Sequence, residues 1–123
     1  AAAFEPGDHA TTYGGQPLAT AAARAVLAVM EAEDVPARAE RAGRRLTDGA
    51  LALAGVREVR GLGLLLAIEL EGHDAKAVAA RLLELGAIVN AVTPSALRLA
   101  PSLLITDDEI DHALQLLAEV VRS

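Results

Sequence analysis

The sequence predicts an α+β fold, in which a small, largely antiparallel sheet with helices packed on one face follows a long interdomain helix. Three observations predict it. Residues from Pro17 to about Glu33 are helix-forming throughout. The patterns after the helices run strand, strand, helix, strand, strand, helix, which is typical of a two-layer domain. The hydrophobic fraction is 53% with only 2% aromatic residues, so we expect one modest core of Ala, Leu, Val and Ile.

The helix from Pro17 to about Glu33 carries a single charge, Arg24, before Glu31. A helix that is apolar almost all round is normally buried on several sides. One small domain does not easily supply that much burial, so we expect this helix to lie between two domains. A second helix begins at Val35-Pro36 and runs to about Leu53, with an apolar stripe at helical spacing.

Four segments are predicted to be strands: Val56–Arg60, in which apolar and polar residues alternate, and Leu64–Leu70, Ala87–Asn90 and Ala96–Leu99. Gly61-Leu62-Gly63 provides a turn or bulge between the first two. Asp74 is suited to cap a helix from Ala75 to Leu85. Thr106 and Glu109 stand at the spacing of a capping box, which opens the last helix.

The composition excludes several classes of function. There are no cysteines, so a disulfide framework and a thiolate metal site are excluded, and the three histidines lack ligand spacing. A net charge of −6 argues against nucleic acid as a partner. No run approaches the roughly twenty apolar residues of a membrane helix, and the start AAAF lacks the basic region of a signal peptide. We expect no metal, no nucleic-acid or membrane partner, and a cytoplasmic location.

The stretch from Pro6 to Leu18, PGDHATTYGGQPL, combines turn residues, hydroxyls and a glycine pair. Gly14-Gly15 lets the backbone approach a ligand closely, and Pro17 suits the first turn of a helix. The unpaired N–H groups of a helix N-terminus favour an anion. Together with the hydroxyls of Thr11 and Thr12, they predict a phosphate-binding corner that has no lysine.

This stretch resembles the segment PG-x-H-x-[ST]-[TS]-[FY]-GG-[NQ]-P of class III (fold type I) pyridoxal-phosphate aminotransferases. Two later stretches agree with the family, GLGLLLAIEL at Gly61–Leu70 and GAIVNAVTPSALRLAPSLLIT at Gly86–Thr106. Within the class, the chain is most similar to acetylornithine and ornithine aminotransferases. The departures, Ala10, Gln16 and Ser102, remove no hydroxyl or charge that the chemistry needs.

The resemblance covers the whole chain but only about the C-terminal third of such an enzyme. It implies three parts: residues 1–16 as a cofactor-phosphate loop of the large domain, residues 17–54 as long helices linking the domains, and residues 55–123 as the small α+β domain. It also implies a missing N-terminal large domain and a homodimer.

The resemblance assigns roles to three residues. The threonine matching Thr12 hydrogen-bonds the phosphate of pyridoxal 5'-phosphate in the neighbouring subunit, across the dimer interface, and Thr11 is the second candidate for the same phosphate. The arginine matching Arg98 binds or positions a substrate carboxylate, for which the planar guanidinium is suited. A structural ion pair is the alternative role for Arg98.

Pyridoxal-phosphate chemistry also requires a lysine that forms a Schiff base with the cofactor. The chain has one lysine, Lys76, on the polar side of a predicted helix and outside the family motifs. In the family, the Schiff-base lysine precedes the PG-x-H segment. We therefore expect no catalytic residue in this chain and no activity from the chain alone.

The resemblance implies transfer of the δ-amino group of N-acetylornithine to 2-oxoglutarate, a reaction of arginine biosynthesis. Ornithine, succinylornithine and 4-aminobutyrate aminotransferases share the motifs and are alternatives. A function of another class also stays open, a stand-alone α+β regulatory module that binds a small anion through the threonine-glycine loop. The apolar first helix argues against the module, because a free-standing domain does not expose such a face.

Overall fold

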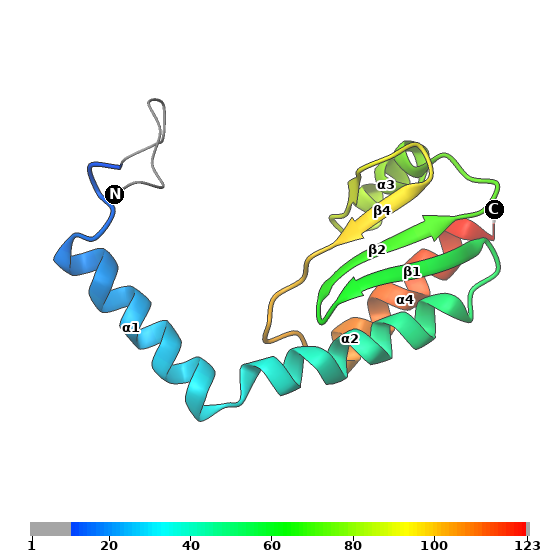
Figure 1. Ribbon diagram of the computed structural model, residues 1–123. Helices are drawn as coiled ribbons and strands as arrows, with labels where there is room; N and C mark the ends of the chain where they lie inside the picture. Colours follow the sequence, from blue (N-terminus) through cyan, green and yellow to red (C-terminus); the bar gives the residue numbers. More distant parts are fainter. Residues whose placement is uncertain (1–10, 123) are drawn as a thin grey trace, which may run out of the picture. The chain divides into compact units, whose positions relative to one another are not determined.

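The computed structural model describes residues 11–122 of the chain (Figure 1). The chain divides into two compact units, Ala1–Asp34 and Val35–Ser123. The described part of the first unit holds helix α1 (Pro17–Ala32). The second unit holds all other elements: α2 (Val35–Leu51), β1 (Val56–Leu62), β2 (Leu65–Leu70), α3 (Ala75–Glu84), β3 (Asn90–Ala91), β4 (Ala96–Leu99) and α4 (Asp107–Val121).

Helix α1 begins at Pro17, whose missing N–H costs nothing at the first helical position. Its sequence is rich in alanine, the strongest helix former. No residue of α1 is buried, and large side chains such as Leu18 and Leu27 are exposed. The burial that its apolar composition predicts therefore requires a surface outside its own unit. None of the helices among the described residues is both long and apolar enough to span a membrane.

The second unit is built on a four-stranded sheet in the order β1-β2-β4-β3. All three strand pairs are antiparallel. Helix α2 packs on β1 and β2, α3 packs on β3 and β4, and both contact α4, so the helices cover one face of the sheet (Figure 1). The α+β class with helices on one face, predicted from the sequence, is confirmed.

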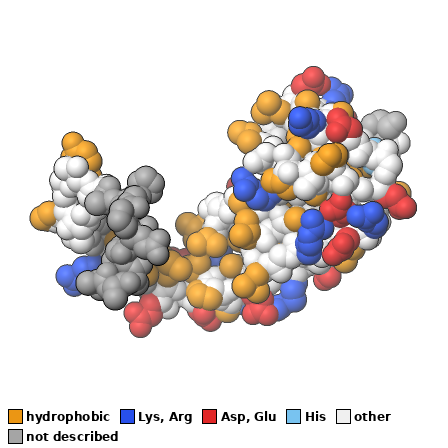
Figure 2. All heavy atoms as spheres, turned by 45° about the horizontal axis from the view of Figure 1, so that its top comes forward, with side chains coloured by type: hydrophobic (Ala, Val, Ile, Leu, Met, Phe, Trp, Pro, Cys, Tyr) orange, Lys and Arg blue, Asp and Glu red, His pale blue; other side chains and the backbone are white. Residues whose placement is uncertain are grey.

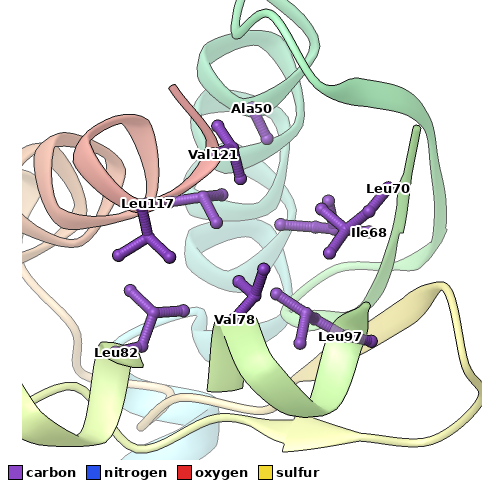
Figure 3. Close-up of a cluster of buried hydrophobic side chains, with 10 residues drawn as sticks. Ala50, Ile68, Leu70, Val78, Leu82, Leu97, Leu117 and Val121 are labelled. Carbon is purple, nitrogen blue, oxygen red and sulfur yellow. The ribbon is translucent and has the colours of Figure 1, made fainter. Parts of the chain in front are cut away.

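The core lies between the sheet and the three helices. Ile68 of β2, Leu97 of β4 and Ile110 of α4 are its largest fully buried side chains. Figure 3 shows Ile68 and Leu97 in one cluster with Leu82 of α3 and Leu117 of α4. Because side chains alternate across a strand, the residues between the buried positions of β2 and β4 point to the opposite face. We call this helix-free side the free face of the sheet.

One predicted strand begins too early. The sequence predicts a strand at Ala87–Asn90, whereas β3 spans Asn90–Ala91. The Ala87 N–H instead donates to the Leu82 carbonyl at 2.8 Å, which satisfies a carbonyl at the end of α3. The inward packing of Ala87, Val89 and Ala91 nevertheless follows the expected alternation.

The hairpin between β1 and β2 turns close to α2. Gly63 lies in the turn with φ +53°, in the left-handed region that favours glycine. A Cβ added to Gly43 of α2 would lie 2.6 Å from the carbonyl carbon of Gly63, so the two backbones meet directly. The irregularity in the β1–β2 register lies elsewhere, between Val56 and Glu58.

Helix α2 belongs to the same compact unit as the sheet. The sequence groups it with α1 in a linking segment, residues 17–54, but its inward stripe packs against the sheet and α4. Ala39, Ala42 and Leu46 form a buried cluster with Leu64 and Leu66 of the hairpin. The boundary at residues 34 and 35 therefore falls between the two helices.

Candidate functional site

The threonines of the predicted phosphate corner lie in the described part of the loop, and Pro6–Ala10 lie outside the described residues. Thr11 and Thr12 are both exposed. The Thr11 hydroxyl oxygen accepts the Tyr13 N–H at 3.4 Å. The Thr12 hydroxyl makes no hydrogen bond to another described residue.

The glycines and the start of α1 shape the same corner. A Cβ on Gly14 would overlap the methyl group of Thr11, so the backbone of the turn lies close to the Thr11 side chain. Gly15 has φ +77°, which other residues rarely adopt. Gln16 caps α1 without a side-chain hydrogen bond, and so leaves backbone N–H groups of the first turn available. Hydroxyl and N–H donors of this kind fit a phosphate ester.

Arg98 lies at the centre of the free face. Its neighbours along β4, Leu97 and Leu99, pack into the core, so the Arg98 side chain points to the opposite side. Arg98 pairs with Ala67 of β2 on one side and with Asn90 of β3 on the other. Its side chain is exposed and forms no hydrogen bond or ion pair with a described residue.

The other arginines beside this face are paired. Glu69 of β2 is only 7% exposed and accepts a hydrogen bond from Arg60 at 2.9 Å. Arg57 lies 3.4 Å from the same carboxylate, and the Ser95 hydroxyl donates to it as well. The hydrogen bonds from Ser95 and Arg60 lower the pKa of Glu69 below its ordinary value, with smaller help from the charges of Arg60 and Arg57. Glu69 thus contacts two arginines, whereas the Arg98 side chain has no such partner among residues 11–122.

Sequence reasoning missed the Glu69 cluster. A charged residue inside the apolar strand LLAIEL, opposite a strand with two arginines, is the signal that points to it. The hydrogen bond from Ser95 to Glu69 connects the turn before β4 to β2. The Leu70 N–H makes a second connection, because it donates to the Ser95 carbonyl at 2.7 Å.

The lowered pKa of Glu69 makes a prediction about acid stability. A carboxyl with a lowered pKa in the folded state stabilises the fold fully above its unfolded pKa, and this contribution is lost as pH falls through the folded pKa. We expect Glu69→Gln to lower the free energy of unfolding above about pH 5, with a deficit that shrinks on acidification. Urea unfolding followed by circular dichroism across pH measures it.

Glu58→Gln is the matched control, because Glu58 lies opposite Glu69 in the β1–β2 pairing. Its side chain is 55% exposed. Its deficit should be small throughout. A Glu69→Gln deficit that stayed constant down to the lowest pH would contradict the role of the charge.

An apolar groove lies elsewhere in the second unit. It encloses about 500 Å³ between the start of α2, the β1–β2 turn and residues 100–103. Its lining is mostly apolar, with Glu40 as its charged side chain. It offers no cation for a carboxylate. Lys76 is exposed on α3, outside both the phosphate corner and the free face.

The class-III aminotransferase family model matches residues 1–121. The acetylornithine aminotransferase of Bifidobacterium longum is 47% identical over 122 residues, covering 98% of this chain and 28% of the relative. The ornithine aminotransferase of Bordetella pertussis is 44% identical over 121 residues, covering 96% of this chain and 29% of the relative.

Solved structures of aminotransferases also superpose on the chain. The acetylornithine aminotransferase of Elizabethkingia anophelis superposes with a TM-score of 0.80 at 30% identity, over 97% of this chain and 33% of the other. The ornithine aminotransferase of Toxoplasma gondii gives a TM-score of 0.79 at 32% identity, over 97% of this chain and 30% of the other. The chain thus spans about a third or less of the length of the relatives it matches. With its family motifs and its small antiparallel domain, the chain belongs to the class III aminotransferases, a family of pyridoxal-phosphate-dependent transaminases of fold type I.

Proposed function

We propose that the chain is the C-terminal segment of an acetylornithine aminotransferase, which transfers the δ-amino group of N-acetylornithine to 2-oxoglutarate in arginine biosynthesis. The observation that carries the proposal is the unpaired Arg98 on the free face, in a chain 47% identical to an enzyme of that name. Donor and acceptor both carry carboxylates, and a guanidinium with no partner among the described residues is suited to bind them in bidentate fashion.

The phosphate corner supplies the second half of the proposal. Thr12, supported by Thr11, holds the phosphate of pyridoxal 5'-phosphate, in a homodimer whose subunits share the cofactor across their interface. When bound, the cofactor supplies the electron sink that amino-group transfer requires. The chain's own contribution is to bind the phosphate at one point and the substrate carboxylate at another.

The remainder of the enzyme supplies what this chain lacks. A large N-terminal domain carries the Schiff-base lysine, and residues 1–16 form part of that domain. Helix α1 links it to the small domain, and the contact covers its exposed apolar side chains. We place the complete enzyme in the cytoplasm.

Ornithine aminotransferase is the second candidate. It is favoured by the Bordetella pertussis relative of that name, whose identity of 44% is close to that of the first. Both reactions transfer a δ-amino group, so the same phosphate and carboxylate sites serve either substrate. The two candidates differ in whether the α-amino group of the donor is acetylated.

A chimeric enzyme tests the proposal, with this chain replacing the segment of the Bifidobacterium longum acetylornithine aminotransferase that it matches. The chimeric enzyme should transfer the amino group of N-acetylornithine to 2-oxoglutarate faster than that of ornithine. Faster transfer from ornithine would favour the second candidate. No transfer from either donor, by a folded dimer, would refute both.

In the chimeric enzyme, Thr12→Ala should weaken cofactor binding about tenfold or somewhat more, because a hydrogen bond to a charged group contributes roughly 1.5–3 kcal/mol. Thr11→Ala should weaken it less. The measurement is titration of the apoenzyme with the cofactor, followed by absorbance.

Thr20→Ala is the matched control, because the Thr20 hydroxyl donates to backbone carbonyls inside α1. It should leave cofactor affinity unchanged. Equal affinities for the parent enzyme and Thr12→Ala would remove the functional role of this loop.

A further inference from the structure

Asn90 lies directly opposite Arg98 on the free face of the sheet. The two residues are partners in the antiparallel β3–β4 pairing, so their side chains point to the same side. Directly opposed residues hold their Cβ atoms about 4.5–5.5 Å apart. The same row continues on the other side of Arg98, where Ala67 lies opposite Arg98 and Arg60 lies opposite Ala67.

Both members of the pair are available to a ligand. Asn90 and Arg98 are exposed, and neither side chain forms a hydrogen bond or ion pair with another residue of 11–122. Arg60 shows the contrast, since Glu69 holds its guanidinium. The orientation of Arg98 therefore has no carboxylate of this unit to fix it, although a bidentate contact demands a fixed guanidinium plane.

Asn90 is the polar residue of β3 that lies opposite Arg98, and the residues near it on the same side are apolar. Ile88 and Val92, two residues away on either side, are exposed apolar side chains. The intervening residues Val89 and Ala91 pack into the core. An asparagine in this position supplies a neutral acceptor, its side-chain oxygen, which does not compete with an anion for the arginine.

We propose that Asn90 is a positioning residue of the carboxylate site, a role that rests on the proposed function. Its short side chain reaches the Nε end of the guanidinium and accepts that N–H, which leaves the two terminal nitrogens directed at the substrate carboxylate. The ligand orders the pair as it binds. Asn90 thus acts on carboxylate-bearing substrates through Arg98.

The test uses the chimeric enzyme defined above, with steady-state kinetics for 2-oxoglutarate. Asn90→Ala should raise KM about five- to tenfold, the effect of one lost hydrogen bond, with kcat nearly unchanged. Asn90→Asp should raise KM further, because its carboxylate pairs with Arg98 and competes with the substrate. Ile88→Ala, an exposed change in the same segment, is the control and should leave KM unchanged.

A double-mutant cycle separates positioning from a structural role. Lysine has no Nε–H of a guanidinium, so Asn90→Ala should add nothing to Arg98→Lys. Independent, multiplicative effects of the two changes on KM would overturn the inference, as would an unchanged KM for Asn90→Ala. The inference would also be overturned if Asn90→Ala lowered the melting temperature and impaired kcat as much as KM, because that pattern indicates a structural role. Inactivity of the parent chimeric enzyme, by contrast, refutes the proposed function and this inference with it.

The 123-residue chain provides a second measurement. Titration with glutarate, a simple dicarboxylate, should shift the NMR signal of the Arg98 Nε–H together with the side-chain amide signals of Asn90. A shift of Arg98 alone, or of neither residue, would contradict the proposed pair.

Discussion

Replacing Leu97 by alanine should lower the free energy of unfolding of the chain by about 2–5 kcal/mol. Leu97 is fully buried, at 0% exposure, in a cluster with Ile68 and Leu82 (Figure 3). It lies on β4, which has a strand on either side, so the backbone cannot move inward to fill the cavity. Urea unfolding followed by circular dichroism measures the loss.

Leu62→Ala is the matched control, because Leu62 lies in the same sheet but is 87% exposed. Its effect should stay within about 0.5 kcal/mol. Equal losses for the two variants would contradict the assignment of the core to the helix-covered side of the sheet.

Features that depend on neighbouring residues were predicted well from the sequence. The capping box is an example: the Glu109 N–H donates to the Thr106 hydroxyl oxygen at 3.3 Å, and the Thr106 N–H donates to the Glu109 carboxylate at 2.8 Å. Asp74 likewise accepts the Ala77 N–H at 3.1 Å. Both caps involve residues three apart, so the sequence pattern alone contains the interaction.

Features that depend on distant partners were predicted less well. The apolar stripe of α2 looks the same whether it packs on α1 or on the sheet, and only the folded contacts place it on the sheet. The start of β3 depends on Ala87, whose N–H is taken by α3. Neither partner is encoded in local periodicity.

The residues of the candidate site also differ in whether local sequence or distant partners reveal them. Thr12 and Arg98 were predicted as site residues through their resemblance to family motifs. The Glu69 cluster and the role proposed for Asn90 were not predicted, because both depend on cross-strand register. A shift of one residue in the pairing would turn Asn90 away from the free face.

Exposed apolar side chains occur on the surface of the second unit among charged ones (Figure 2). Leu62, Leu65 and Ile88 are among the most exposed. Such residues are common at surfaces that other domains cover, and the proposed large domain provides that cover. The same requirement applies to α1. The regulatory-module alternative leaves both surfaces in water and is therefore disfavoured.

Arg98→Lys should raise the KM for 2-oxoglutarate of the chimeric enzyme by about tenfold to a hundredfold, because lysine keeps the charge but loses the bidentate fork. Cofactor absorbance should not change, since Arg98 serves the carboxylate. Stability should change little as well, because Arg98 has no ion-pair partner among residues 11–122. The small expected change in stability separates carboxylate binding from a role in a structural ion pair, because breaking a buried ion pair costs about 3–5 kcal/mol.

Arg60→Lys is the matched comparison, since Arg60 lies in the same row of the sheet but is held by Glu69 at 2.9 Å. It should reduce the melting temperature more than Arg98→Lys does and alter KM far less. Because the two substitutions are chemically identical, any difference between them reports on what each guanidinium binds. A large loss of melting temperature for Arg98→Lys with unchanged KM would exclude the carboxylate role. It would favour the alternative role in a structural ion pair, with the large domain of the chimeric enzyme supplying the acidic partner.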